Sequence, residues 1–167
     1  VALRRQTSPL VQVFLDDPEL LVAEEAARAI HDERGPVDAL PALAARVGAT
    51  PTSPPLERRA LNANLRLGTP EAAGRLLTFA LNEGAPRELR LEALESLALW
   101  NRPPSLDRVD GYARTYHPVP VGAVLAPRLD ALLSLADSQL KTRAIEIMIA
   151  HGLQAPPDRL ADLVATP

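Results

Sequence analysis

The side chains best suited to contact a partner gather in one stretch of this 167-residue chain. Aromatic residues make up only 3% of the chain, yet the single Trp and both Tyr fall close together at Trp100, Tyr112 and Tyr116. Among them lie Arg102, Arg108, Arg114 and His117. Aromatic and Arg side chains are frequent anchors of protein–protein interfaces. These seven residues are therefore a candidate interaction surface. The alternative is a structural plug, in which Trp100 fills the core and the tyrosines pin the loop.

A second set of arginines occupies the same position in successive copies of a repeated helical pattern, at Arg75, Arg128 and Arg159. On a shared face they would form a basic ladder able to bind carboxylates with paired hydrogen bonds. Alternatively, each Arg braces its own repeat against an acidic residue of a neighbouring repeat. Ala42 stands at the equivalent position of one repeat.

We expect no catalytic, cofactor or metal site in this chain. His31, His117 and His151 share no register, whereas a metal site needs converging ligands. Asp32 and Glu33 follow His31 directly but should point elsewhere on a helix. The chain has no Cys, which excludes disulfides, thiolate metal sites and cysteine nucleophiles within it. It also carries no P-loop and no GxSxG nucleophile motif.

A recurring helix pattern must position these side chains. Four helical segments superpose on alanines that are 34, 33 and 51 residues apart: Ala26, Ala60, Ala93 and Ala144. Four later segments superpose on leucines that are 33, 53 and 31 residues apart: Leu43, Leu76, Leu129 and Leu160. Such periods are typical of solenoids built from helix pairs. Because both registers lengthen in the same repeat, an insertion lies there, over the proline-rich residues 101–120.

The pattern predicts an all-α fold: a right-handed α–α superhelix of about four to five helix pairs with one loop insertion. The predicted pairs cover residues 18–32 with 37–48, 55–67 with 70–83, 86–100 with 121–135, and 138–151 with 156–165. We expect all eight anchor residues to be buried. We expect residues 1–167 to form a single helical-repeat domain, which we interpret as a fragment of a longer protein because the repeat pattern is cut at both ends.

Net charge and hydropathy limit the kinds of partner that this chain can bind. With 18 basic and 21 acidic residues, the net charge is −3, which argues against a nucleic-acid-binding face. No apolar run reaches the roughly 18 residues that cross a bilayer. Leu10, Val13 and Phe14 near one end, and the segment DRLADLVA near the other, form no polar cap. This predicts weak self-association through the ends of the solenoid.

Several stretches resemble one bacterial family. They are FLDDPELLVAEEAARAIHD (14–32), LERRALNANLRLG (56–68), LRLEALESLALW (89–100) and DRVDGYAR (107–114). They are similar to the HEAT-like segment of large secreted multidomain proteins of Planctomycetes and relatives, often described as sorbosone- or membrane-bound-dehydrogenase-like. In that family a β-propeller precedes this segment, and a c-type cytochrome domain with CxxCH follows it. No haem-binding or dehydrogenase residue carries over to this chain, because it contains neither part.

The resemblance implies a non-catalytic scaffold or docking module in an exported, dehydrogenase-like parent, with neighbouring domains or another protein as partners. An alternative is a free-standing adaptor that binds a protein or peptide in its groove. A third is a HEAT-like enzyme such as a DNA glycosylase or a bilin lyase. The acidic charge counts against the glycosylase, and only the fold speaks for the lyase. In the interaction hypothesis, the insertion packs back through one aromatic residue and leaves another aromatic and one Arg exposed.

Overall fold

The regular secondary structure of the described chain is helical. The computed structural model describes residues 8–155, and within this range the only β feature is an isolated bridge between Leu106 and Ala113. This confirms the predicted all-α class. The predictions for residues 1–7 and 156–167, including Leu160 and Arg159, lie outside the described residues.

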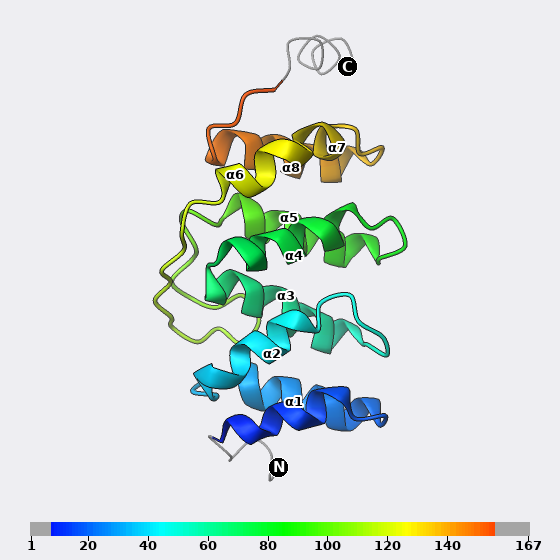
Figure 1. The fold of residues 1–167 in the computed structure, drawn as a ribbon, viewed down its shortest axis with the longest axis vertical. Helices are drawn as coiled ribbons and strands as arrows, with labels where there is room; N and C mark the ends of the chain where they lie inside the picture. The colour runs from blue at the N-terminus through cyan, green and yellow to red at the C-terminus, as the bar shows by residue number, and fades with distance from the viewer. Residues whose placement is uncertain (1–7, 156–167) are drawn as a thin grey trace.

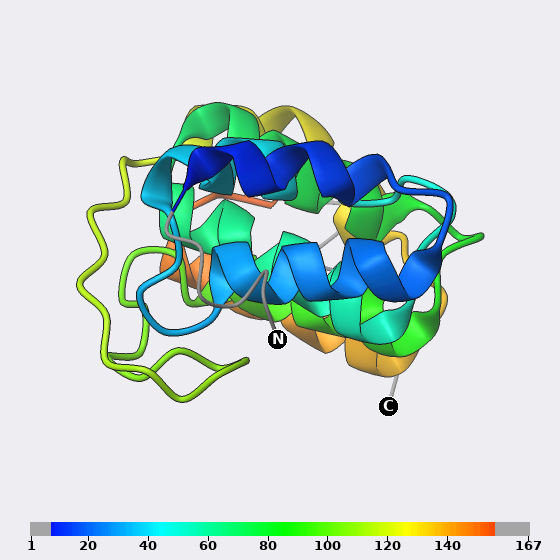
Figure 2. The same cartoon turned by 90° about the horizontal axis from the view of Figure 1, so that it is seen from below.

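The helices form two layers (Figures 1 and 2). In the first layer, four long helices stack in chain order and each packs on the next: α1 (Leu20–His31), α3 (Pro54–Leu67), α5 (Arg87–Ala98) and α8 (Ser138–Ala150). The second layer holds shorter elements: η2 (Pro9–Asp16), η3 (Val37–Ala39) with α2 (Leu40–Ala45), α4 (Pro70–Leu81), and α6 (Gly122–Leu125) with η4 (Ala126–Arg128) and α7 (Leu129–Leu133). The chain alternates between the layers, so neighbours within a layer come from successive repeats.

The anchor residues are buried as predicted wherever the structure describes them. The four anchor alanines are fully buried on α1, α3, α5 and α8. Leu43, Leu76 and Leu129 are buried on α2, α4 and α7. A small side chain at each alanine lets adjacent helices approach closely, while each leucine fills the space between the layers. Packing thus explains why both residue types recur at one interval.

Local signals explain most helix boundaries. The hydroxyls of Ser53 and Thr69 accept hydrogen bonds from backbone N–H groups in the first turns of α3 and α4, and each helix begins with Pro. Gly68 ends α3 in the left-handed conformation, with φ of 63°. The segment predicted as one helix over 121–135 is divided into α6, η4 and α7, because Pro127 lacks the N–H that a continuous helix needs. None of the described helices combines the length and apolar character needed to cross a membrane.

The insertion, residues 101–120, runs along one side of the stack (Figure 1, left). It leaves the end of α5, meets the C-terminal end of α1 and returns to α6. At its far point Asp110 accepts a hydrogen bond from the backbone N–H of Glu33, at 2.7 Å. On the way back, the N–H of Val119 donates to the carbonyl oxygen of Gly68 at 2.9 Å. One loop therefore contacts three levels of the first layer.

Candidate functional site

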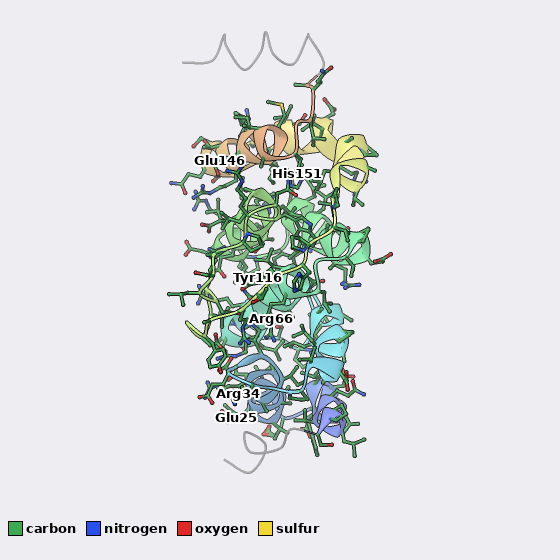
Figure 3. The ribbon with its side chains drawn as sticks, turned by 90° about the vertical axis from the view of Figure 1, so that its left-hand side faces the viewer. Glu25, Arg34, Arg66, Tyr116, Glu146 and His151 are labelled. Atoms are coloured by element: carbon green, nitrogen blue, oxygen red, sulfur yellow. The ribbon has the colours of Figure 1, made fainter. Side chains whose placement is uncertain are left out.

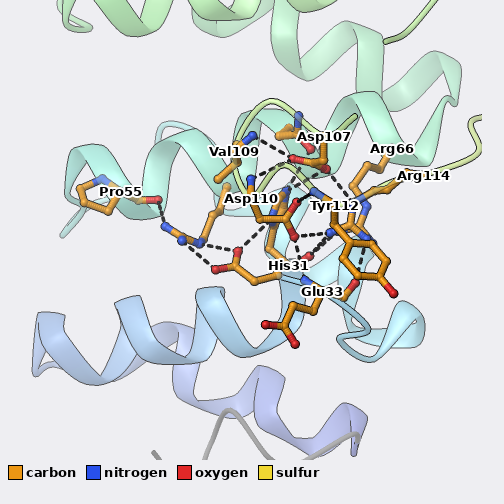
Figure 4. Close-up of polar contacts among 12 residues, drawn as sticks. His31, Glu33, Pro55, Arg66, Asp107, Val109, Asp110, Tyr112 and Arg114 are labelled. Carbon is orange, nitrogen blue, oxygen red and sulfur yellow. Dashed lines mark hydrogen bonds and ion pairs between the residues drawn. The ribbon is translucent and has the colours of Figure 1, made fainter. Parts of the chain in front are cut away.

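A polar cluster lies where the insertion meets the C-terminal end of α1 (Figures 3 and 4). Its side chains come from α1 and the residue after it, from α3 and from the insertion. They are joined by hydrogen bonds and ion pairs into one connected group, which we call the polar cluster. Its members are His31, Asp32, Arg59, Asn62, Arg66, Asp107, Asp110 and Arg114.

His31 is the fully buried last residue of α1. Its Nδ1 lies 3.1 Å from Asp32 Oδ1, and its Nε2 lies 2.9 Å from Asn62 Oδ1 on α3. The expectation that Asp32 points away from His31 is wrong. The helix ends at His31, and Asp32 takes an extended conformation with ψ of 149°, so its carboxylate turns back toward the imidazole.

Asp32 joins α1 to α3 through a bidentate ion pair. Arg59 donates from Nε to Oδ1 at 3.0 Å and from Nη2 to Oδ2 at 2.9 Å. Burial alone would raise the pKa of Asp32, but the hydrogen bonds from His31 and Arg59 overcome it and lower the pKa to about 2. The carboxylate is therefore charged at all pH values near neutrality.

Arg114 fastens the insertion to the rest of the cluster. Its guanidinium donates to Asp107 Oδ2 at 2.7 Å and to Asp110 Oδ2 at 2.6 Å, both within the insertion. It also donates to the backbone carbonyls of His31 and Glu33, at 2.8 and 2.9 Å. Those carbonyls lie at the end of α1, where no intrahelical donor remains. A cation at a helix C-terminus is also favoured by the helix dipole.

Two aspartates shape the turn of the insertion. Asp107 is buried, and its Oδ1 accepts hydrogen bonds from the N–H groups of Val109 and Asp110. Asp110 Oδ1 accepts from the N–H of Tyr112 at 2.9 Å. These side-chain-to-backbone bonds close the turn, so the second carboxylate oxygen of each aspartate faces Arg114.

The arrangement includes a set of metal-compatible ligand atoms that sequence reasoning missed. One atom each of His31, Asp32 and Asp110 lies within 4.8 Å of the others. However, arginine side chains already form hydrogen bonds with these carboxylates. Arg59 binds both oxygens of Asp32, and Arg114 binds Asp110. The observed hydrogen bonds assign the cluster a holding role, fixing the insertion against α1 and α3.

The aromatic residues of the candidate surface face inward to different degrees. Trp100 is fully buried, and its Nε1 donates to the carbonyl of Val119 at 2.9 Å. Tyr112 is half-buried, stacks with Arg114 at 5.3 Å and accepts a hydrogen bond from Arg34. Tyr116 is also half-buried. Its buried hydroxyl has no hydrogen-bond partner among residues 8–155, and burial followed by the charge of Asp107 raises its pKa. Trp100 thus belongs to the core and not to an exposed surface.

The cationic residues of that surface also separate. The Arg114 side chain is only 9% exposed and its donors bind groups of the polar cluster, so it is not available to an exposed docking face. Arg108 is exposed and pairs with Glu95 of α5. Arg102 and His117 are exposed, and neither side chain has a polar partner in the described part of the chain. The insertion therefore keeps exposed cations but no fully exposed aromatic ring.

The structure describes two of the three arginines of the predicted ladder, and these two have different surroundings. Arg75 donates to Asn64 Oδ1 at 2.8 Å, and the amide of this buried Asn64 donates to the carbonyls of Ala44 and Ala60. Arg75 thus takes part in a brace between α2, α3 and α4. Arg128 is exposed on η4. Arg159 lies outside the described range.

Sequence reasoning missed most of the polar cluster, because its members come from three segments that lie far apart in the chain, 31–32, 59–66 and 107–114. Two local signals could have indicated it. The acidic pair of DRVDGYAR, Asp107 and Asp110, is spaced as a turn closed by side chains. The His31–Asp32 pair ends a helix just before Gly35. Neither signal identifies Arg59 or Arg114 as a partner.

No protein-family model, curated protein or solved structure matches the chain, so its function must be argued from these contacts.

Proposed function

We propose that this chain is a non-catalytic interaction module of the HEAT-like type, a right-handed superhelix of helix pairs. In this proposal it holds neighbouring domains of a larger, exported, dehydrogenase-like protein at a fixed separation. The observation that carries the proposal is an apolar surface at the N-terminal end of the described stack. The composition of the polar cluster supports it too, because its charged groups bind one another and stiffen the module.

The apolar surface, which we call the end face, consists of exposed large side chains on η2 and at the start of α1. These are Leu10, Val13, Phe14 and Leu21. Both helices lie at the end of the described stack (Figure 1, bottom). Grouped exposed apolar residues mark interaction sites in water-soluble proteins. In repeat proteins each helix pair contacts mainly its neighbours, so such an end accepts another packed unit.

A matched pair of valines tests the end face. Val13 is 64% exposed on η2, and Val37 is 69% exposed on η3, where it lines a pocket beside Ala113 and Arg114 of the insertion. We expect the isolated chain to self-associate weakly through the end face. Val13→Lys should abolish this association because a charge enters the buried surface, whereas Val37→Lys should leave it unchanged. Light scattering over a concentration series measures the effect.

Two results would contradict the proposal. A wild-type chain that stays strictly monomeric at millimolar concentration would show that the end face does not mediate self-association. Equal loss of association in both variants would show that the contact does not use this surface.

A further inference from the structure

A groove that is open to solvent lies between α3, α5 and the insertion, and it shares Arg59 and Asn62 with the polar cluster. It encloses about 460 Å³. The sides and floor are formed by Pro55, Arg58, Arg59, Leu61, Asn62, Glu92, Ser96, Arg108 and Val109, and we call it the arginine groove. Its lining carries three arginines and one glutamate.

Several hydrogen-bond donors of the arginine groove are not used within the described chain. Arg58 donates from Nε to Glu92 Oε1 at 2.7 Å, and its two terminal nitrogens have no hydrogen-bond partner among residues 8–155. Within the same described residues, Arg108 donates only from Nη2, to Glu95. Asn62 is only 5% exposed and its Oδ1 faces His31, while its amide nitrogen has no partner among residues 8–155. The buried unpaired side-chain atoms of residues 8–155 are Arg46 Nε and the Tyr116 hydroxyl, so the Asn62 amide nitrogen is accessible from the groove and can donate to a ligand there.

We propose that the arginine groove binds a carboxylate, supplied by an acidic side chain of a neighbouring domain or partner protein. This inference rests on the proposed function and adds the chemistry of one contact. Guanidinium groups present paired N–H donors that match the two oxygens of a carboxylate. The amide of Asn62 supplies a further, neutral donor.

The composition of the groove favours a carboxylate on a short aliphatic stem. Pro55, Leu61 and Val109 provide apolar wall next to the donors, which suits the methylene groups of a Glu or Asp side chain. Acidic groups already balance the arginines, because Arg58, Arg59 and Arg108 pair with Glu92, Asp32 and Glu95. A singly charged carboxylate therefore fits better than a doubly charged phosphate group, which these acidic residues would repel.

Two ion pairs with similar exposure and the same shortest N···O distance provide the test; Arg87 makes further hydrogen bonds to Asp137 and Gln139. Arg58 is 46% exposed and lies 2.7 Å from Glu92; Arg87 is 45% exposed and lies 2.7 Å from Asp137, outside the groove. The probe is a blocked peptide of alternating Gly and Glu, compared with the same peptide carrying Gln for Glu. Binding to the full chain is followed at low ionic strength by calorimetry and by the NMR signal of the Asn62 side-chain amide.

We expect saturable binding of the Glu peptide and a shift of the Asn62 amide signal, with no saturable binding of the Gln peptide. Arg58→Gln should weaken binding about tenfold, since one charge-assisted interaction is lost. Arg87→Gln should bind like the wild type. Both variants remove an exposed pair, so neither should change the unfolding midpoint appreciably.

Three results would overturn the inference. The first is the absence of saturable binding by the Glu peptide. The second is equal weakening by Arg58→Gln and Arg87→Gln, which would indicate non-specific attraction. The third is binding of free glutarate as tight as that of the peptide, which would assign the groove to a small dicarboxylate. The Val13→Lys experiment uses a different surface, so failure of the groove and failure of the proposed module can be distinguished.

Discussion

At the scale of single residues, Asp32 determines how the end of α1 responds to acid. Its carboxylate receives two hydrogen bonds from Arg59 and faces the imidazole of His31. These partners favour the charged form only in the folded chain. The pKa of Asp32 is about 2 when folded, compared with 3.8 for an unperturbed group. Folding stability therefore depends on this residue being ionised.

The sign of the pH effect follows from that lowered pKa. The stabilisation by Asp32 is fully present above the unfolded value of 3.8 and is lost as the pH falls through about 2. We expect Asp32→Asn to lower the free energy of unfolding by about 2 kcal/mol at pH 7. The difference from the wild type should narrow as the pH falls below 4. Urea unfolding from pH 7 to pH 3 measures both effects.

The control for this variant is Glu146→Gln, which alters the exposed pair between Arg143 and Glu146. It should change the free energy of unfolding by less than about 1 kcal/mol. A pH-independent difference between wild type and Asp32→Asn would contradict the assignment of the effect to ionisation.

At the scale of elements, the repeat register places α1, α3, α5 and α8 correctly, because buried Ala and Leu recur with the period of a helix pair. The register does not predict how the second layer is divided. Pro127 breaks one expected helix into short pieces, and α2 covers only Leu40–Ala45. Local backbone chemistry outweighs the apolar pattern there.

Leu76 tests the packing between the layers. It is fully buried on α4 in the middle of the larger hydrophobic core. Leu76→Ala should lower the free energy of unfolding by about 2–5 kcal/mol, because it removes buried methyl groups and leaves a cavity. Thr78, exposed on the same helix, provides the control, and Thr78→Ala should change stability by less than about 0.5 kcal/mol. Chemical denaturation measures the free energy of unfolding of both variants. A small loss of stability in Leu76→Ala would contradict the assignment of Leu76 to the core.

Gly68 tests the contact between the insertion and the turn after α3. Gly68 and Gly111 both have positive φ, at 63° and 71°, so Ala is strained at either position. A Cβ at Gly68 would lie 2.8 Å from the Cα of Pro118, whereas one at Gly111 would have no heavy atom within 4 Å. Gly111→Ala should cost about 1 kcal/mol, from the backbone alone. Gly68→Ala should cost about 1–3 kcal/mol more, because the backbone of the insertion must move.

Thermal or urea unfolding compares the two glycine variants, and limited proteolysis reports on the insertion itself. Gly68→Ala should expose residues 101–120 to cleavage more than Gly111→Ala does. Equal stability and equal cleavage of the two variants would show that the insertion is not held at Gly68.

At the scale of the whole molecule, the insertion gives the stack a contact pattern that its repeats alone would lack. A row of helix pairs has mainly local contacts, so its ends can open separately. Here Arg114 reaches His31 and Glu33, which precede it by 83 and 81 residues. The first helix pair, which contains α1, is therefore linked to the third pair, which contains the insertion. The sequence pattern cannot predict this tie, since it depends on hydrogen bonds from one side chain to backbone carbonyls of a segment that no periodicity relates to it.

Arg114→Ala should uncouple the two parts of the stack. The side chain is only 9% exposed and serves two carboxylates and two carbonyls, so its loss leaves buried charges unpaired and should cost about 3–5 kcal/mol. Hydrogen exchange should show the amides of α1 opening before those of α5. Arg143→Ala, at a 38% exposed pair, should leave both regions as in the wild type. Uniform acceleration of exchange across α1 and α5 would contradict the tie.

The long reach of Arg114 also has a consequence for synthesis on the ribosome. The carbonyls of His31 and Glu33 are made more than 80 residues before the guanidinium that binds them. At roughly 5–20 residues per second, the nascent chain waits on the order of 4–16 s for this partner. During that interval the first helix pair can form and Arg66 can bind the carbonyl of His31, but the carbonyl of Glu33 stays in water. A pause in translation before residue 114 would prolong this incomplete state and leave the N-terminal half open to chaperones and proteases.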